Sequence, residues 1–322
     1  MEDEVTAVTF KIGPIFHLIH MSDDFWALNE WYAEVFGAVE FTKSMRTSAP
    51  GGSFPTWMVE LRDASLITVA DVTFEPMSPS RFIDGWEKMP VGRFYNKFGR
   101  HWHSIAWYVD DTLALYRDLK DRNIRFFFNG GGADSAREPS PDEAIFTHPK
   151  DSCGALEIMR GPREGLTDPR FQPGYDSGYW EREHPLGVRR LAYITVVVSD
   201  LDKGKSVYVD ALKGKLLAEQ DSVLTMTKNA YVAVGDHTIV ELAQPFEPGT
   251  LAGSELAKNG DIMHAIAFQV ADLDRAEQHL TGKGVRILDR DDSTLLADPD
   301  TTFGAPFRFT TAAIPGDPRD AG

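Results

Sequence analysis

The stretch FHLIHMSDDFWALNEWYAEVFGAVEF, residues 16–41, predicts a strand, a helix and a second strand in close succession. The apolar run at its start has the length of a strand. The Ser22/Asp23 pair that follows can cap a helix, because both side chains accept hydrogen bonds from backbone N–H groups. Gly37 suits the end of this helix, since glycine adopts the left-handed backbone conformation easily.

The same pattern occurs three more times, and internal repeats of this kind decide the architecture of a chain. The further copies are WHSIAWYVDDTLALYRDLKDRNIRFF (102–127), LAYITVVVSDLDKGKSVYVDALKGKLL (191–217) and MHAIAFQVADLDRAEQHLTGKGVRIL (263–288). Each copy has an aspartate that can cap its helix: Asp110 or Asp111, Asp200 and Asp272.

Further strand-like runs follow each helix. They are TWMVEL and SLITVADV, EAIFTHP and GALEIM, AYVAVGD and HTIVELA, and STLLADP and APFRFTT. Each repeat therefore predicts one βαβββ module. A lone module leaves one face of its sheet exposed, so we expect modules to pair. Pairing within one chain and pairing between two chains both satisfy this need, and the second would produce a homo-oligomer.

Two segments interrupt the repeats. Residues 160–187 are rich in proline and glycine and poor in apolar runs, which is typical of a linker. We therefore predict an N-terminal domain at 1–163, a linker at 164–188 and a C-terminal domain at 189–322. Residues 73–100 read as a long irregular insertion, and such insertions are often functional loops or covers.

Composition narrows the partners and the compartment. The chain has 322 residues and a net charge of −16, which opposes binding to nucleic acid and to anionic membrane surfaces. A single cysteine, Cys153, excludes an intramolecular disulfide and a thiolate zinc site built from one chain. The acidic N-terminus has no apolar signal core, and no apolar run is long enough to span a bilayer. We predict a cytoplasmic protein.

Four βαβββ modules, with histidine on a first strand and glutamate on a last strand, resemble the vicinal oxygen chelate superfamily. This superfamily includes glyoxalases, bleomycin-resistance proteins, epimerases and type I extradiol dioxygenases. The resemblance covers residues 16–310 apart from the linker. It implies an α+β fold of four βαβββ modules in two tandem pairs, in which each pair forms an open mixed β-sheet half-barrel with flanking helices.

The resemblance also implies where a metal would bind, because ligands in this superfamily come from the first and fourth strands of each module. The first-strand positions here are His17, His103, Tyr193 and His264. The fourth-strand positions map to Thr68, Glu157, Glu241 and Phe307. The N-terminal pair therefore offers a metal site of His17, His103 and Glu157. The C-terminal pair, with only Glu241 and His264, is predicted to be a degenerate copy.

Three other histidines have weaker patterns. The register of the second module is ambiguous by one residue, so His101 is the alternative to His103 as the second ligand. His20 lies three residues after His17 and is expected on the opposite face, as a structural residue. His148, nine residues before Glu157, is a candidate catalytic acid or base beside the metal, or else an ordinary turn residue.

Two histidines and one carboxylate bind a divalent metal on one side and leave positions open for substrate and O₂. Glyoxalase-like and epimerase members generally carry a fourth ligand, so its absence favours an extradiol-type dioxygenase with Fe(II). The alternatives are a lyase or isomerase with Mn, Zn, Ni or Co, and a metal-free protein that binds an aromatic ligand. Six of the seven tryptophans lie within residues 1–107, which suits an aromatic small-molecule substrate or simply a large core.

Overall fold

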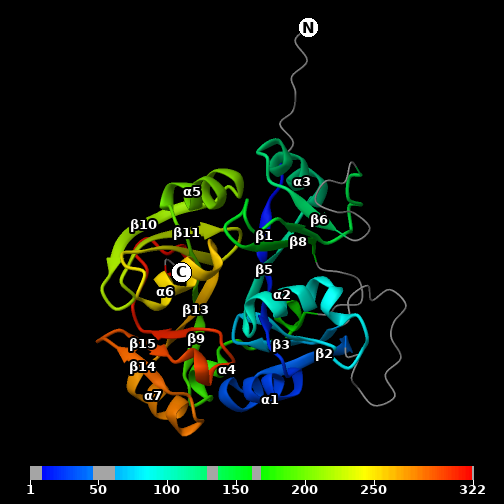
Figure 1. Ribbon diagram of the computed structural model, residues 1–322. Helices are drawn as coiled ribbons and strands as arrows, with labels where there is room; N and C mark the ends of the chain where they lie inside the picture. Colours follow the sequence, from blue (N-terminus) through cyan, green and yellow to red (C-terminus); the bar gives the residue numbers. More distant parts are fainter. Residues whose placement is uncertain (1–8, 46–61, 129–136, 162–167, 321–322) are drawn as a thin grey trace.

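The computed structural model describes residues 9–45, 62–128, 137–161 and 168–320. It contains two mixed β-sheets of eight strands each, with helices packed against them and no closed barrel (Figure 1). The predicted α+β class and the tandem βαβββ architecture are confirmed.

The first sheet has the strand order β2-β3-β4-β1-β5-β8-β7-β6. Its strands are β1 (Ile12–Met21), β2 (Val39–Met45), β3 (Arg62–Val69), β4 (Val72–Pro79), β5 (His101–Val109), β6 (Phe126–Phe128), β7 (Ile145–Thr147) and β8 (Ala155–Arg160). The second sheet repeats this arrangement as β10-β11-β12-β9-β13-β16-β15-β14. Its strands are β9 (Val188–Val197), β10 (Lys215–Ser222), β11 (Thr227–Val234), β12 (Thr238–Pro245), β13 (Ile262–Val270), β14 (Ile287–Arg290), β15 (Thr294–Ala297) and β16 (Phe307–Thr310).

The helices follow the first strand of each repeat or lie between repeats. They are α1 (Phe25–Phe36), α2 (Pro90–Phe98), α3 (Thr112–Asp121), α4 (Tyr179–Arg182), α5 (Leu201–Lys205), α6 (Leu251–Asn259) and α7 (Leu273–Gly282). A π-helical stretch, Ser206–Ala211, continues α5. Among the described residues, no helix has the length and apolar character needed to cross a membrane.

Modules pair within the chain. The first strands of the two N-terminal modules, β1 and β5, are antiparallel neighbours at the centre of the first sheet. The last strand of each module lies parallel on the outer side of its first strand, β4 beside β1 and β8 beside β5. The second sheet has the same plan around β9 and β13. First and last strands, which carry the predicted ligand positions, are therefore adjacent.

An aspartate caps the helix of every repeat. The side chains of Asp111, Asp200 and Asp272 accept backbone N–H groups at the starts of α3, α5 and α7, as predicted. In the first repeat the cap is Asp24, which accepts from Ala27 N at 3.0 Å, and not the predicted Ser22/Asp23 pair. The helix starts one residue later than the pattern indicated, because Phe25 is its first apolar anchor.

Asp24→Ala is expected to lower the free energy of unfolding by about 1 kcal/mol, because the N–H group of Ala27 loses its acceptor. Urea denaturation measures the change. Glu34→Ala, an exposed position on the same helix, is the control and should change stability by less than about 0.5 kcal/mol. Equal effects in the two variants would contradict the capping role.

One apolar core joins the two sheets. Phe36 of α1 lies 5.4 Å from Phe268 of β13 and 5.5 Å from Phe307 of β16, measured between ring centroids. Helices also meet across the halves, since His279 Nε2 of α7 lies 2.8 Å from the carbonyl oxygen of Val35, and Figure 1 shows α1 next to α7. The two halves are therefore packed together and are not merely tethered.

The segment between the halves is also packed. Arg170 pairs with Asp168 and donates to the carbonyl oxygens of Ile15 and Phe16 on β1. The same Asp-Pro-Arg motif recurs at the end of the second half, where Arg319 pairs with Asp317 and donates to the carbonyl oxygens of β9 residues. Part of the predicted linker thus closes the first half as residues 317–319 close the second. The domain boundaries themselves stay a prediction.

Candidate functional site

Strand register identifies four equivalent positions in the first sheet. Ile19 of β1 pairs with Glu75 of β4, and Ala106 of β5 pairs with both His17 and Glu157. His103 lies three residues before Ala106 on the same strand. The candidate site is therefore built from His17, Glu75, His103 and Glu157, one residue from each of the four central strands.

The fourth position was predicted wrongly as Thr68. Thr68 lies on β3, where it pairs with Val39 and Thr73, and β4 separates β3 from β1. The last strand of the module is β4, which occupies the start of the segment that was predicted to be an irregular insertion. Glu75 on this strand takes the place that had been given to Thr68.

Two local features hid β4 from the sequence. The hairpin between β3 and β4 turns at Ala70 and Asp71, and Ala70 has a positive φ of 49°. Glycine or asparagine usually marks such a turn, so the run SLITVADVTFEP lacked the expected signal. Pro76 and Pro79 also spoke against a central strand, because proline cannot donate a hydrogen bond to a neighbouring strand.

The centre of the site is His17. Its Nε2 atom lies 3.2 Å from Glu75 Oε2 and 3.2 Å from Glu157 Oε2. All three residues are buried, with 3%, 2% and 7% of their surface exposed. Burial alone would raise the pKa of Glu157, but His17, Arg62 and His103 lower it below its usual range. Two carboxylates thus face one imidazole nitrogen in a buried place, where like charges need a cation between them.

His103 is held with one ring nitrogen available. Its Nδ1 atom lies 2.8 Å from Ser104 Oγ, and its ring packs 4.3 Å from the ring of Phe94 on α2. Burial lowers the pKa of His103 to about 4, so the ring is neutral near pH 7. A neutral imidazole whose second nitrogen is fixed by a hydrogen bond is the form that binds a metal.

The other histidines are engaged elsewhere. His101 has Nδ1 2.5 Å from the carbonyl oxygen of Trp102 and Nε2 3.0 Å from Glu255 Oε1 of the second half, so His103 is the better second donor. His20 lies 2.9 Å from the hydroxyl of Tyr32 and 3.2 Å from the carbonyl oxygen of Phe303, in keeping with a structural role.

His148 has its side-chain contacts away from the site in the described part of the chain. Its ring stacks on Phe127, and its Nδ1 atom lies 3.4 Å from Arg125 Nη2 and 3.3 Å from the backbone nitrogen of Lys150. These contacts belong to the turn between β7 and β8. A catalytic role for His148 stays a prediction that no contact with His17, Glu75 or Glu157 supports.

The donor set fits a divalent metal in chemistry and in spacing. Neighbouring donors in an octahedral site with bonds of about 2.1 Å lie about 3.0 Å apart, close to the 3.2 Å between His17 Nε2 and each carboxylate. Within the described residues, however, no three His, Cys, Asp or Glu side chains already converge as a metal site. Binding would therefore require the ring of His17 to turn from a hydrogen-bond donor into a ligand.

The second sheet has an arginine in the equivalent site. Thr195 pairs with Glu241, and Ala267 pairs with both Tyr193 and Arg308. The four equivalent positions are therefore Tyr193, Glu241, His264 and Arg308, and the prediction of Phe307 was wrong by one residue. Phe307 instead matches Leu156 and lies in the main apolar core.

Arg308 supplies the positive charge in this half. Its Nη1 atom lies 2.6 Å from Glu241 Oε2, and both side chains are at least 95% buried. The Glu241 carboxylate also accepts hydrogen bonds from Thr195, Asn229 and Tyr231. Its acceptor sites are filled, so this half does not bind a metal in the manner proposed for the first. The predicted degeneracy thus has a specific form, a buried ion pair.

Comparisons with known proteins can now be added. A family model described as the Glyoxalase/Bleomycin resistance protein/Dioxygenase superfamily matches residues 190–300. A triple mutant of 4-hydroxymandelate synthase from Streptomyces coelicolor is similar in structure over 97% of this chain and 96% of that chain, with a TM-score of 0.64 and 12% identity. At this identity the likeness shows the fold alone.

Shorter similarities are also found. Methylmalonyl-CoA epimerase from Mycobacterium tuberculosis matches 39% of this chain and 90% of that chain, with 24% identity and a TM-score of 0.37. Methylmalonyl-CoA epimerase from Streptomyces coelicolor, in complex with 2-nitronate-propionyl-CoA, gives 39%, 99%, 24% and 0.36 for the same quantities. Curated protein sequences give no match. By its repeated modules, its fold and its family match, the chain belongs to the glyoxalase/bleomycin resistance/dioxygenase superfamily.

Proposed function

We propose that the protein is a metal-dependent lyase or isomerase of the vicinal oxygen chelate type, with His17, Glu75, His103 and Glu157 as metal ligands. Members of the superfamily are mostly enzymes and typically use a divalent metal. The observation that carries the proposal is the pair of buried carboxylates, Glu75 and Glu157, each 3.2 Å from His17 Nε2.

Glu75 changes the choice between reactions. A three-ligand set favours an extradiol dioxygenase, whereas glyoxalase-like and epimerase members generally have a fourth ligand. Because Glu75 takes the fourth position, the set matches the second group, and Zn, Ni, Co and Mn become better candidates than Fe(II). The same ligand types bind all these metals, so the donors alone do not select one.

The chain's own residues would orient the substrate and move a proton. Ser104 and Phe94 fix the ring of His103, and Arg62 Nη2 lies 3.4 Å from Glu75 Oε1. The carboxylates of Glu75 and Glu157 are the groups in the site that can accept a proton. A bound divalent metal would supply positive charge to two neighbouring substrate oxygens and so acidify an adjacent proton.

The substrate is proposed to be a small molecule with two adjacent oxygens and an apolar or aromatic part. Phe94 and Phe98 of α2 pack on each other at 4.4 Å between centroids, and both rings lie beside the histidines of β5. The tryptophans supply less of this surface than their number suggested, because Trp102 and Trp107 are fully buried in the core. Cytoplasmic location and homo-oligomer formation stay predictions.

A second candidate is the extradiol-type dioxygenase with Fe(II) held by His17, His103 and Glu157. The contact between Arg62 and Glu75 favours it, because an arginine that keeps hold of Glu75 would leave only three ligands. An aromatic substrate would then bind through adjacent hydroxyl groups. O₂ consumption separates this candidate from the lyase or isomerase.

Metal content of protein purified without oxygen tests both candidates. We expect about one Zn, Ni, Co or Mn per chain, no O₂ uptake with catechol, and loss of the metal in His17→Ala, Glu157→Ala and His103→Ala. His148→Ala is the matched histidine control and should keep the metal.

Other outcomes would change the assignment. Iron at the same stoichiometry, with O₂ uptake, would replace the main proposal by the dioxygenase. A protein that binds no metal even when each of these ions is added would contradict both, and would favour a metal-free binding protein.

A further inference from the structure

The second half contains two adjoining cavities beside Arg308. One measures about 240 Å³ and the other about 350 Å³, and both are lined by Leu224, Thr225 and Arg308. Ligand pockets commonly have volumes of this order. Leu251 and Leu288 line the smaller cavity and are 43% and 48% exposed, so apolar side chains border its opening.

Arg308 has unused hydrogen-bond donors. A guanidinium group has five N–H donors and no acceptor. Within the described part of the chain, its side-chain partners are Glu241 and Tyr193. Because Arg308 lines both cavities, the remaining N–H groups can bind an acceptor atom placed there.

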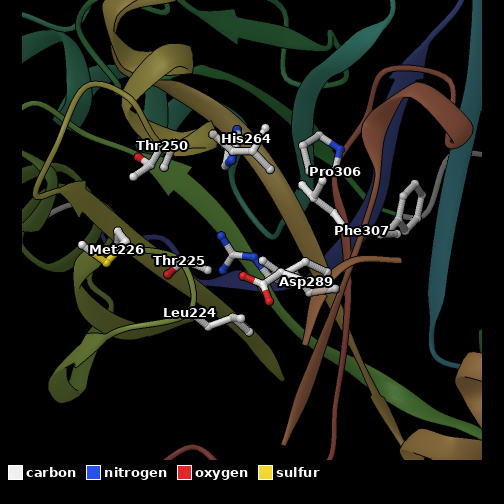
Figure 2. Close-up of a pocket in the computed structure, with 14 residues that line it drawn as sticks. Leu224, Thr225, Met226, Thr250, His264, Asp289, Pro306 and Phe307 are labelled. Atoms are coloured by element: carbon white, nitrogen blue, oxygen red, sulfur yellow. The ribbon is translucent and has the colours of Figure 1, made fainter. Parts of the chain in front are cut away.

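His264 provides a second polar group. Its Nδ1 atom is buried without a hydrogen-bond partner, although only 4% of the residue is exposed. The residue lines the smaller cavity, where Figure 2 shows it on the side of Thr250, with Thr225 and Met226 opposite. A buried ring nitrogen without a partner is costly unless a ligand completes it.

Charge limits the class of ligand. Glu241 already balances the charge of Arg308, and burial lowers the pKa of His264 to about 3, so this ring is neutral. Asp289 and Asp291 add negative charge at the margins of the two cavities. An anionic ligand would therefore meet no net positive charge, whereas an uncharged polar group would meet donors without repulsion.

We propose that the second half is a metal-free binding site for an uncharged, largely apolar small molecule that carries an amide or hydroxyl group. The apolar part fills the cavity bordered by Leu251 and Leu288. The polar group accepts a hydrogen bond from Arg308 and completes that of His264. This site is separate from the proposed metal centre and does not depend on it.

Benzamide is a suitable probe, because it has a ring, an acceptor and a donor and is uncharged. Benzoate has nearly the same shape and a negative charge. We expect saturable binding of benzamide in titrations followed by NMR of the histidine rings, with shifts at His264. Benzoate should bind at least about 5-fold more weakly, the equivalent of one net hydrogen bond.

Three variants locate the binding. Leu251→Trp should fill the opening and abolish benzamide binding, while Leu216→Trp, an exposed leucine outside both cavities, should leave it unchanged. His264→Phe should weaken binding by about 5-fold to 10-fold. It should not destabilise the ligand-free protein, because it removes a buried nitrogen that has no partner. A merely structural role for His264 would give the reverse pattern.

Four results would overturn the proposal. They are no saturable binding to the wild type, tighter binding of benzoate than of benzamide, binding that persists in Leu251→Trp, and binding that is lost in Glu157→Ala. The last two would place the ligand at the metal centre of the first half. Loss of metal from the first half without loss of benzamide binding would contradict only the proposed enzymatic function.

Discussion

Replacing Glu75 by glutamine is expected to lower the affinity for the divalent metal by at least about 100-fold, since even the outer partners of metal ligands often contribute 10-fold to 100-fold. The amide keeps the size of the side chain and removes the charge that holds the metal. Competition against a chelator of known affinity measures the change. Turnover should fall with the metal, once a substrate is known.

Thr68→Val is the matched control, because Thr68 holds the position that sequence mapping alone gives to the fourth ligand. It is expected to leave metal affinity unchanged. The metal-free Glu75→Gln protein should be as stable as the wild type or more so, because Glu75 and Glu157 no longer repel each other across His17. If Thr68→Val lost the metal and Glu75→Gln kept it, the proposed ligand set would be wrong.

The fold was predictable because the repeats reinforce one another. Each repeat carries an apolar first strand, a capping aspartate and an amphipathic helix, and four copies at a similar spacing outweigh the ambiguity of any single one. His17, His103 and Glu157 could be placed for the same reason. Each lies on a strand whose neighbours in sequence are clearly apolar.

Glu75 and Arg308 could not be placed, because each lies on a strand with an irregular start. The turn before β4 uses Ala70 in a left-handed conformation, and prolines inside and at the end of the strand conceal it. In β16, Pro306 precedes the first paired residue and shifts the strand by one position relative to β8. A shift of one residue exchanges the two faces of a strand, so it exchanged Phe307 for Arg308.

Contacts between the halves were beyond any local pattern. The hydrogen bond between His101 and Glu255 joins residues 154 positions apart, and it occupies a histidine that the sequence left as an alternative ligand. Likewise, Trp102 packs against Phe307 and donates to the carbonyl oxygen of Pro306. Only the packing of one sheet against the other determines that these side chains are structural.

Arg308→Met is expected to lower the free energy of unfolding by about 3–5 kcal/mol, because it leaves the charge of Glu241 buried without its cation. Urea denaturation measures this effect. Arg189→Met is the control, since the Arg189–Glu181 pair is exposed and should contribute less than about 1 kcal/mol. Metal content of the folded Arg308→Met protein should be unchanged, because the metal is proposed to bind in the other half.

The double variant Arg308→Met, Glu241→Gln should recover most of the lost stability. An amide in place of Glu241 is uncharged and can still accept from Thr195 and Tyr231, so no unpaired charge stays buried. If the double variant were as unstable as Arg308→Met alone, the cost would come from lost packing of the arginine and not from charge. The proposal that Arg308 takes over the role of the metal in the second half would then fail, because that role requires the charge itself to matter.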